Sequence, residues 1–152
     1  MKVDGRHFRS IWLEPDGWSV GAIDQRRLPH EFVVARIATA DEAGEAISSM
    51  LVRGAPLIGA TAAYGYAMAL AADPGDASLQ AAYETLFETR PTAINLRWAL
   101  DAVRAAVADL PEGERAAAAF RRADEICDED AELCRAIGEH GLELFRELHA
   151  RN

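Results

Sequence analysis

The residues of this sequence that best suit chemistry are arginines placed just before expected helix starts. Over residues 53–56, the sequence Arg-Gly-Ala-Pro lies between two apolar helical runs. Proline suits the first turn of a helix, because it has no amide hydrogen to leave unbonded and its φ is already helical. The free N–H groups of that turn and the positive end of the helix dipole attract anions, and Arg53 adds a guanidinium. This combination suits an anionic oxygen cluster such as phosphate.

A second arginine repeats this arrangement ahead of another helix. Pro91 restricts Arg90 to an extended conformation, and the Thr92 hydroxyl can cap the helix that follows. If the two helix starts converge, Arg53, Arg90 and the Thr92 hydroxyl form one pocket for a phosphate monoester. The structural alternative is an arginine at a plain helix–helix turn, with Gly54 as the C-terminal cap of the preceding helix. The spacing alone leaves both interpretations open.

Composition indicates a globular protein that is a poor binder of polyanions. The chain has 152 residues, of which 50% are hydrophobic, enough for one domain with a core. Its 16 Lys and Arg against 25 Asp and Glu give a net charge of −9, which disfavours nucleic-acid and anionic-membrane partners. The longest apolar run, residues 57–72, is too short to cross a bilayer and is expected to form a buried helix. The N-terminus lacks the apolar core of a signal peptide.

The other residue types with reactive potential give weaker signals. Cys127 and Cys134 lie seven positions apart in a helical pattern, about 10 Å along the axis, too far for a disulfide. We expect reduced, at least partly buried cysteines in a cytoplasmic protein. The acidic segment 124–132 is interpreted as a solvated helix face rather than as paired catalytic carboxylates, and His140 as a structural hydrogen-bonding residue. No motif predicts a metal or a cofactor.

The first 38 residues have the pattern of a small antiparallel sheet. Residues 10–15 and 18–24 read as strands joined by a turn at Asp16-Gly17. Residues 31–38 are rich in β-branched side chains and predict a third strand.

The remainder, residues 39–152, predicts a helical bundle, so the expected fold class is α+β and mostly helical. Thr39 and Glu42 form a capping box for a helix that runs to Arg53-Gly54. The next helix, from Pro56 to Ala72, is rich in small residues and is expected to be central, with Tyr64 and Tyr66 needing hydrogen-bond partners. Further helices are expected over Ala77–Glu88, over Ala93–Leu110 with Leu96, Ala99, Leu100, Val103 and Val107 on one face, and over Arg115–His149.

Two glycines within the last expected helix, Gly138 and Gly141, are unfavourable there by about 1 kcal/mol each relative to alanine. They predict close approach of a neighbouring helix or domain.

Five blocks along the chain resemble one known family. The resemblance is to the S-methyl-5-thioribose-1-phosphate isomerase family of methionine salvage, which is related to regulatory subunits of the eukaryotic initiation-factor exchange factor and to ribose-1,5-bisphosphate isomerases. It covers essentially the whole chain in order. The segment 25–30 and the block around Arg53 favour the isomerase over its regulatory relatives. The blocks are Ile11-Trp-Leu, Ile23-Asp-Gln-Arg-Arg-Leu-Pro-His30, Val52-Arg-Gly-Ala-Pro-Leu-Ile-Gly59, Thr89-Arg-Pro-Thr-Ala-Ile-Asn-Leu96 and Arg135-Ala-Ile-Gly-Glu-His-Gly141.

The resemblance implies an aldose–ketose isomerase that converts 5-methylthioribose 1-phosphate to 5-methylthioribulose 1-phosphate. It implies that Arg53, Gly54 and Ala55 contact the substrate and that Arg90 also binds it. It further implies a homodimer. The composition, as described above, predicts a cytoplasmic location and neither nucleic-acid nor membrane partners, and we expect no cofactor. Whether the hydrogen moves as a proton or as a hydride stays open.

The resemblance also implies that catalysis needs more than residues 1–152, which match one N-terminal domain of the family. The family continues into a Rossmann-like domain that supplies a catalytic cysteine and aspartate. Cys127 and Cys134 do not match that cysteine, so we expect the catalytic groups beyond Asn152 and no activity from this chain alone. A separate C-terminal fragment is an alternative partner to a second copy. Two other functions stay open: a non-catalytic assembly or regulatory module, and an isomerase of another phosphorylated pentose.

Overall fold

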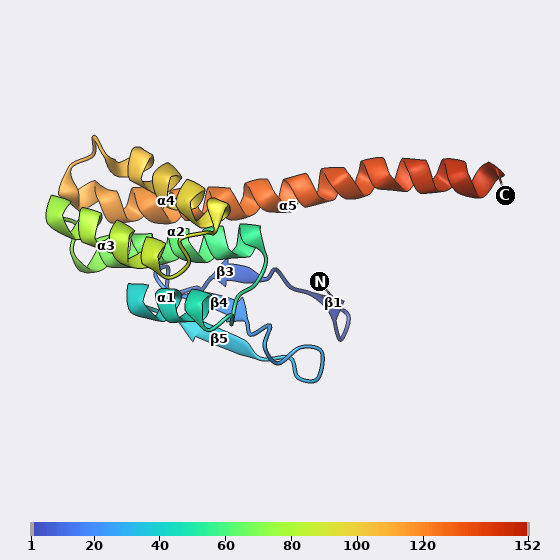
Figure 1. Cartoon of the computed structure of the whole chain (residues 1–152), viewed down its shortest axis with the longest axis horizontal. Helices are drawn as coiled ribbons and strands as arrows, with labels where there is room; N and C mark the ends of the chain where they lie inside the picture. Colours follow the sequence, from blue (N-terminus) through green and yellow to red (C-terminus); the bar gives the residue numbers. More distant parts are fainter. Residues whose placement is uncertain (1, 152) are drawn as a thin grey trace.

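The computed structural model describes residues 2–151, and it confirms the expected mostly helical α+β fold (Figure 1). Small antiparallel sheets occupy the N-terminal part and helices the remainder. The strands are β1 (Lys2–Val3), β2 (Arg6–His7), β3 (Ile11–Leu13), β4 (Val20–Ile23) and β5 (Val34–Ile37). The helices are α1 (Ala40–Ser48), α2 (Ala55–Ala72), α3 (Asp76–Glu88), α4 (Ile94–Val107) and α5 (Glu112–Arg151).

The expected three-stranded sheet is present, with β4 paired antiparallel to both β3 and β5. Its first turn forms because the Asp16 carboxylate accepts hydrogen bonds from the backbone N–H groups of Trp18 and Ser19, at 3.0 and 2.9 Å. Gly17 supplies the positive φ of +79° that this turn needs. The pairing of β1 with β2 was not predicted, because strands of two residues show no alternation.

Helix α2 is the centre of the bundle, as its small residues predicted, and it packs against α1, α3, α4 and α5. A Cβ atom at Gly59 would lie 2.8 Å from the backbone oxygen of Asn95 in α4, and one at Gly65 would lie 2.7 Å from the Cβ of Ala43 in α1. The expectation that this apolar run is too short to cross a bilayer is wrong for the whole helix, because α2 passes the test of length and composition for a membrane span. However, 72% of α2 is buried inside the fold. It is therefore the core helix of the bundle.

The two tyrosines of α2 have the partners that their burial requires. The Tyr64 hydroxyl donates to Asp124 Oδ1 at 2.5 Å, and the Tyr66 hydroxyl donates to the Leu79 carbonyl at 3.0 Å. Burial raises the pKa of Tyr66 to about 12. The hydroxyls therefore stay protonated and join α2 to α5 and α3.

The α1 boundaries differ from those predicted. Thr39 Oγ1 accepts from the Glu42 N–H at 3.1 Å as expected, but the Glu42 carboxylate accepts from the N–H of Ala38 rather than from Thr39. The helix ends at Ser48 rather than at Arg53-Gly54, because Met50 takes a left-handed φ of +61° although the apolar pattern continues. The predicted role of Gly54 as a C-terminal cap is wrong, since this residue directly precedes α2.

The start of α4 also differs. Its N-cap position is Ala93, which has no side chain able to cap, so the predicted Thr92 cap is wrong and Thr92 is exposed. The predicted buried face is confirmed, because Leu96, Ala99, Leu100, Val103 and Val107 are all buried. The starts of α3 and α5, at Asp76 and Glu112, lie one and three residues before those predicted.

Helix α5 runs along the bundle and then projects far beyond it (Figure 1). The acidic segment is largely a solvated face, where Arg122 pairs with Glu125 and Glu129. Cys127 is half-buried, but Cys134 is exposed, contrary to expectation. The neighbour predicted from Gly138 and Gly141 is not found among residues 2–151, since no atom outside the helix backbone lies within 4 Å of a Cβ at either position.

Candidate anion-binding site

The loop between α1 and α2 presents the start of α2 to solvent. Gly54 adopts a φ of +90°, a backbone conformation that disfavours other residues, and its carbonyl accepts the first helical bond from the N–H of Ile58 at 3.0 Å. Pro56 lies in the first turn, as predicted, and no side chain caps the helix. The first-turn N–H groups of Ala55 and Leu57 have no partner within the helix. They remain available to an anion.

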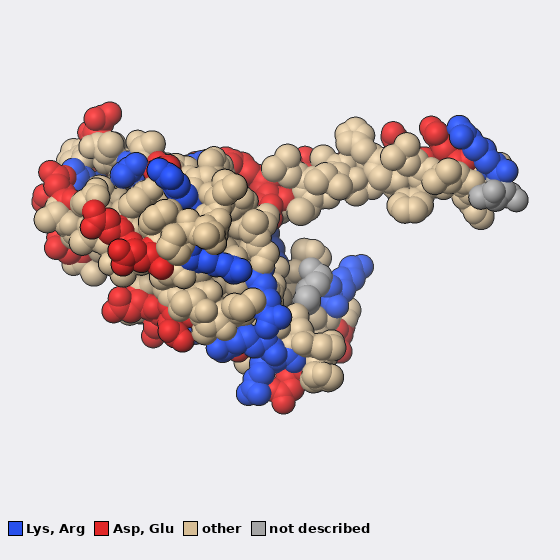
Figure 2. Space-filling model, in the orientation of Figure 1, with Lys and Arg blue, Asp and Glu red and all other residues tan. Residues whose placement is uncertain are grey.

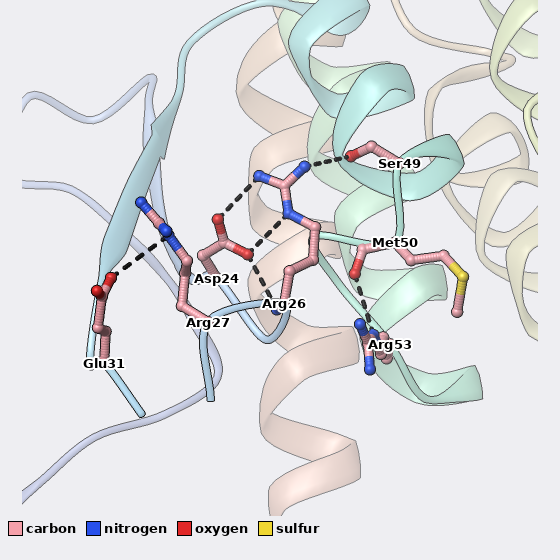
Figure 3. A network of polar contacts seen from close by, with 7 residues as sticks. All are labelled: Asp24, Arg26, Arg27, Glu31, Ser49, Met50 and Arg53. Atoms are coloured by element: carbon pink, nitrogen blue, oxygen red, sulfur yellow. Dashed lines mark hydrogen bonds and ion pairs between the residues drawn. The ribbon is translucent and has the colours of Figure 1, made fainter. Parts of the chain in front are cut away.

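The Arg53 side chain is held beside this helix start (Figure 3). Its Nε donates to the carbonyl oxygen of Met50 at 3.2 Å, which fixes the guanidinium plane while leaving its two terminal nitrogens available. Arg53 is exposed and has no carboxylate partner among residues 2–151. An uncompensated guanidinium next to free backbone N–H groups suits a phosphate.

An ion pair at the end of β4 supports the same loop, and sequence reasoning missed it. Arg26 binds the buried Asp24 carboxylate through two nitrogens, Nε at 2.9 Å and Nη2 at 2.8 Å, and its third nitrogen donates to Ser49 Oγ at 3.2 Å (Figure 3). The N–H of Gln25 donates to the Leu51 carbonyl at 2.9 Å. The Arg26 guanidinium lowers the pKa of Asp24, so the carboxylate stays charged. The sequence block that contains Asp24 and Arg26 could have drawn attention to these residues, but that they pair and reach Ser49 depends on the fold.

Arg90 lies in the loop between α3 and α4 and is half-buried. Its backbone N–H donates to the Phe87 carbonyl at 3.3 Å, and its carbonyl accepts from the N–H of Ala93 at 3.0 Å. The preceding Thr89 side chain lies 3.2 Å from a Cβ built on Gly44, so this loop rests on α1. Like Arg53, Arg90 forms no ion pair within the described residues.

The two helix starts come together, but no described contact joins their arginines. Gly59, one turn into α2, lies against the backbone of Asn95 in the first turn of α4, so the N-terminal parts of the two helices lie side by side. Arg53 and Arg90 project from the loops that precede these helices.

Charge is unevenly distributed around these loops (Figure 2). On the face shown, Lys and Arg side chains form a band that follows the loop between α1 and α2 and continues to the loop after β4. Acidic side chains gather instead over the opposite end of the bundle. A protein with a net charge of −9 therefore has a locally basic surface where the anion site is expected.

A cavity of about 390 Å³ opens beside the start of α2. Neither Arg53 nor Arg90 lines it, and its walls are mainly apolar. Among residues 2–151 no group of three His, Cys, Asp or Glu side chains is arranged to hold a metal ion. The arrangement can bind an anion.

Known proteins resemble the chain in sequence and in structure. The model of the Initiation factor 2 subunit family matches residues 51–150. The methylthioribose-1-phosphate isomerase of Brucella anthropi is 59% identical over 99% of this chain and 42% of its own length. The enzyme of the same name from Rhodospirillum centenum is 55% identical over 100% of this chain and 40% of its own length.

Two solved structures share the fold. The crystal structure of 5-methylthioribose 1-phosphate isomerase from Pyrococcus horikoshii superposes with a TM-score of 0.79 at 37% identity, over 89% of this chain and 40% of that one. The delta subunit of translation initiation factor eIF-2B from A. fulgidus gives 0.81 at 33% identity, over 91% of this chain and 42% of that one. The chain thus spans about 40% of the length of its relatives, and it belongs to the Initiation factor 2 subunit family.

Proposed function

We propose that this chain is the substrate-binding half of a methylthioribose-1-phosphate isomerase. The whole enzyme would convert 5-methylthioribose 1-phosphate to 5-methylthioribulose 1-phosphate in methionine salvage. The observation that carries the proposal is the 55–59% identity, over nearly the whole chain, to proteins that bear this name.

The geometry at the start of α2 supports a role in holding the phosphate. Gly54 and Ala55 offer backbone at the positive end of the helix, and Arg53 adds terminal nitrogens that have no protein partner. Arg90, on the neighbouring helix start, is the proposed second guanidinium. A phosphate held by two arginines fixes the sugar while its C1 and C2 atoms remain open to groups from elsewhere.

Residues 1–152 are proposed to act as one N-terminal domain. The hydrogen transfer is proposed to depend on groups outside this domain. Isomerisation opens the sugar ring and moves a hydrogen, as a proton or as a hydride, from C2 to C1, which requires catalytic groups close to both carbons. The relatives are more than twice as long as this chain, so they have room for a Rossmann-like domain with these groups. We propose a homodimer, or pairing with a separate C-terminal fragment, located in the cytoplasm. The free cysteines fit that location.

Isothermal titration with 5-methylthioribose 1-phosphate tests the phosphate site. We expect Arg53→Ala to weaken binding about 10-fold or more, because hydrogen bonds between charged groups are worth about 1.5–3 kcal/mol. Arg146→Ala is the matched control, since Arg146 is also exposed and lies far along α5. Equal affinity of wild type and Arg53→Ala would contradict the proposed site.

Turnover by the chain alone provides a second test. The purified 152-residue chain is expected to give no 5-methylthioribulose 1-phosphate. Measurable product formation would show that a complete catalytic set lies within these residues.

A non-catalytic assembly or regulatory module is the second candidate function. The TM-score to the eIF-2B delta subunit is 0.81, and that to the Pyrococcus horikoshii isomerase is 0.79, so the fold supports the two functions equally. Phosphate binding discriminates between the two, because a purely structural module has no use for the uncompensated Arg53. An isomerase of another phosphorylated pentose is a third candidate. Its substrate would carry a different group from methylthio at the end of the sugar opposite the phosphate.

A further inference from the structure

Met50, between α1 and α2, holds a backbone conformation that residues other than glycine disfavour. Its φ is +61°, in the left-handed region, and the chain leaves α1 just before it. In this conformation the Met50 carbonyl accepts a hydrogen bond from Arg53 Nε at 3.2 Å (Figure 3). Such a conformation persists only where the surrounding structure holds it. The direction of the Arg53 guanidinium therefore depends on what holds the turn at Met50.

Two contacts from the segment after β4 hold the residues on either side of Met50. Arg26 Nη1 donates to Ser49 Oγ at 3.2 Å. The Gln25 N–H donates to the Leu51 carbonyl at 2.9 Å. This segment is far from the turn in sequence, so the shape of the turn depends on the packing of the sheet region against the end of α1.

The Arg26 side chain has the geometry that such a support needs. Its Nε and Nη2 bind the two oxygens of the Asp24 carboxylate at 2.9 and 2.8 Å, and the Asp24 side chain is only 8% exposed. A two-point pair fixes the plane of the guanidinium, so the third nitrogen meets Ser49 from one direction. Because the charge of Arg26 is already compensated, this residue is a poor ligand for an anion. Arg53, by contrast, forms no ion pair within residues 2–151.

We propose that Arg26 is a positioning residue for the phosphate site. The inference rests on the proposed function and extends it to a residue that does not touch the substrate. Held by Asp24, Arg26 fixes Ser49. The turn at Met50 then keeps its shape, and its carbonyl holds the Arg53 guanidinium beside the first turn of α2. Without the Arg26–Ser49 contact, the Arg53 side chain is freer before binding, and the order that binding must restore costs affinity.

Titration with 5-methylthioribose 1-phosphate tests the proposal in two variants of the 152-residue chain. Ser49→Ala removes only the contact with Arg26, and Arg26→Lys keeps the charge but loses the two-point geometry. Each is expected to weaken binding by about 2- to 10-fold, the fold-change that corresponds to one hydrogen bond. Arg27→Lys is the matched control, because Arg27 is the next residue and lies near Glu31 at 3.5 Å, away from the turn (Figure 3). It should bind as the wild type does.

A double-mutant cycle separates positioning from general support of the fold. If Arg26 acts through Arg53, Arg26→Lys should have no further effect on affinity once Arg53→Ala has removed the guanidinium. A purely structural role would give the same loss in both backgrounds. Thermal unfolding should show that every variant is folded at the temperature of the titration.

The Nε–H group of Arg53 gives a readout that needs no ligand. Its nuclear magnetic resonance signal in isotope-labelled protein is identified by its absence from Arg53→Lys. Because Nε donates to the Met50 carbonyl, this proton should exchange slowly with water in the wild type and in Arg27→Lys. It should exchange faster in Ser49→Ala, where the turn is less firmly held.

The outcomes distinguish this inference from the proposed function. Wild-type affinity in Ser49→Ala and Arg26→Lys would overturn the positioning role and leave the phosphate site standing. An equal loss in the Arg53→Ala background, or an unchanged exchange rate of the Arg53 proton, would do the same. No binding of the sugar phosphate by the wild type would overturn the phosphate site and the positioning role with it.

Discussion

The two halves of α5 belong to one continuous helix, but they lie in different surroundings. The proximal half, residues 112–131, buries Ala118, Ala119, Ala123 and Ile126 and packs against α2 and α4. The distal half, residues 132–151, projects from the bundle (Figure 1), and its large apolar side chains, such as Ile137 and Phe145, are 70% and 73% exposed.

Their stabilising interactions differ accordingly. The distal half relies on local ion pairs one turn apart, between Arg135 and both Glu132 and Glu139 and between Arg151 and Glu147. Such pairs are exposed to solvent, so each one contributes little to stability. The proximal half is held by burial, which is worth several times more per residue. The comparison shows that helix formation and tertiary packing are separate contributions within one helix.

Truncating one apolar side chain in each half is expected to give the largest contrast. Ile126→Ala should lower the free energy of unfolding by about 2–5 kcal/mol, because the residue is 4% exposed and its removal leaves a cavity. Ile137→Ala should change it by less than about 0.5 kcal/mol. Chemical denaturation followed by circular dichroism measures both. A similar loss for the two variants would mean that the distal half is packed in solution.

The two cysteines are expected to react at very different rates. Burial raises the pKa of Cys127 from 9.0 to about 11, which lowers its thiolate fraction about 100-fold near neutral pH. Cys134 is exposed. Alkylation at pH 7.5, followed by mass spectrometry of the peptides, should modify Cys134 first. Modification of both at the same rate would contradict the burial of Cys127, and Cys134→Ser identifies the slower site.

Glycine replacements should act in opposite directions in the packed and projecting helices. Gly65→Ala should destabilise by about 1–3 kcal/mol, because the new Cβ would lie 2.7 Å from that of Ala43. Gly138→Ala should stabilise by about 0.5–1 kcal/mol, since nothing lies within 4 Å of a Cβ there and alanine is the better helix former. Thermal unfolding of both variants measures the difference. Destabilisation by Gly138→Ala would reveal a neighbour at that position.

The smallest difference is expected between a buried and an exposed ion pair, Asp24–Arg26 and Glu132–Arg135. The pKa of Asp24 is lowered by Arg26, so its contribution to stability is present above the ordinary pKa of 3.8 and is lost as the pH falls through the lower folded value. We expect Asp24→Asn to cost about 1 kcal/mol at pH 7 and to flatten the acid limb of the stability profile. Glu132→Gln, in the exposed pair with Arg135, should have less effect at any pH. Urea midpoints between pH 2 and 7 separate the two.

Much of the fold was predictable from local signals. The Asp16-Gly17 turn, the Thr39 cap and the small residues of α2 each act over a few positions, and the structure confirms each one. The end of α1 was not predictable from the apolar pattern, because Met50 continues the pattern while its backbone leaves the helix.

The site was predictable only in part. Pro56 marks the start of α2 from sequence, and Arg53 lies beside it as expected. The Asp24–Arg26 pair that supports the loop becomes visible only when β4 is placed against the end of α1. The apolar cavity is lined by residues from three helices, so no single stretch of sequence predicts it.

More than half of α2 consists of alanine and glycine. These side chains have essentially no rotamer freedom to lose, so ordering the central helix costs little side-chain entropy, whereas a buried leucine or isoleucine gives up about 0.5–1 kcal/mol. The helix instead depends on close backbone contact for its dispersion energy. The bundle is therefore organised around its least flexible side chains, and the larger, more mobile ones surround them.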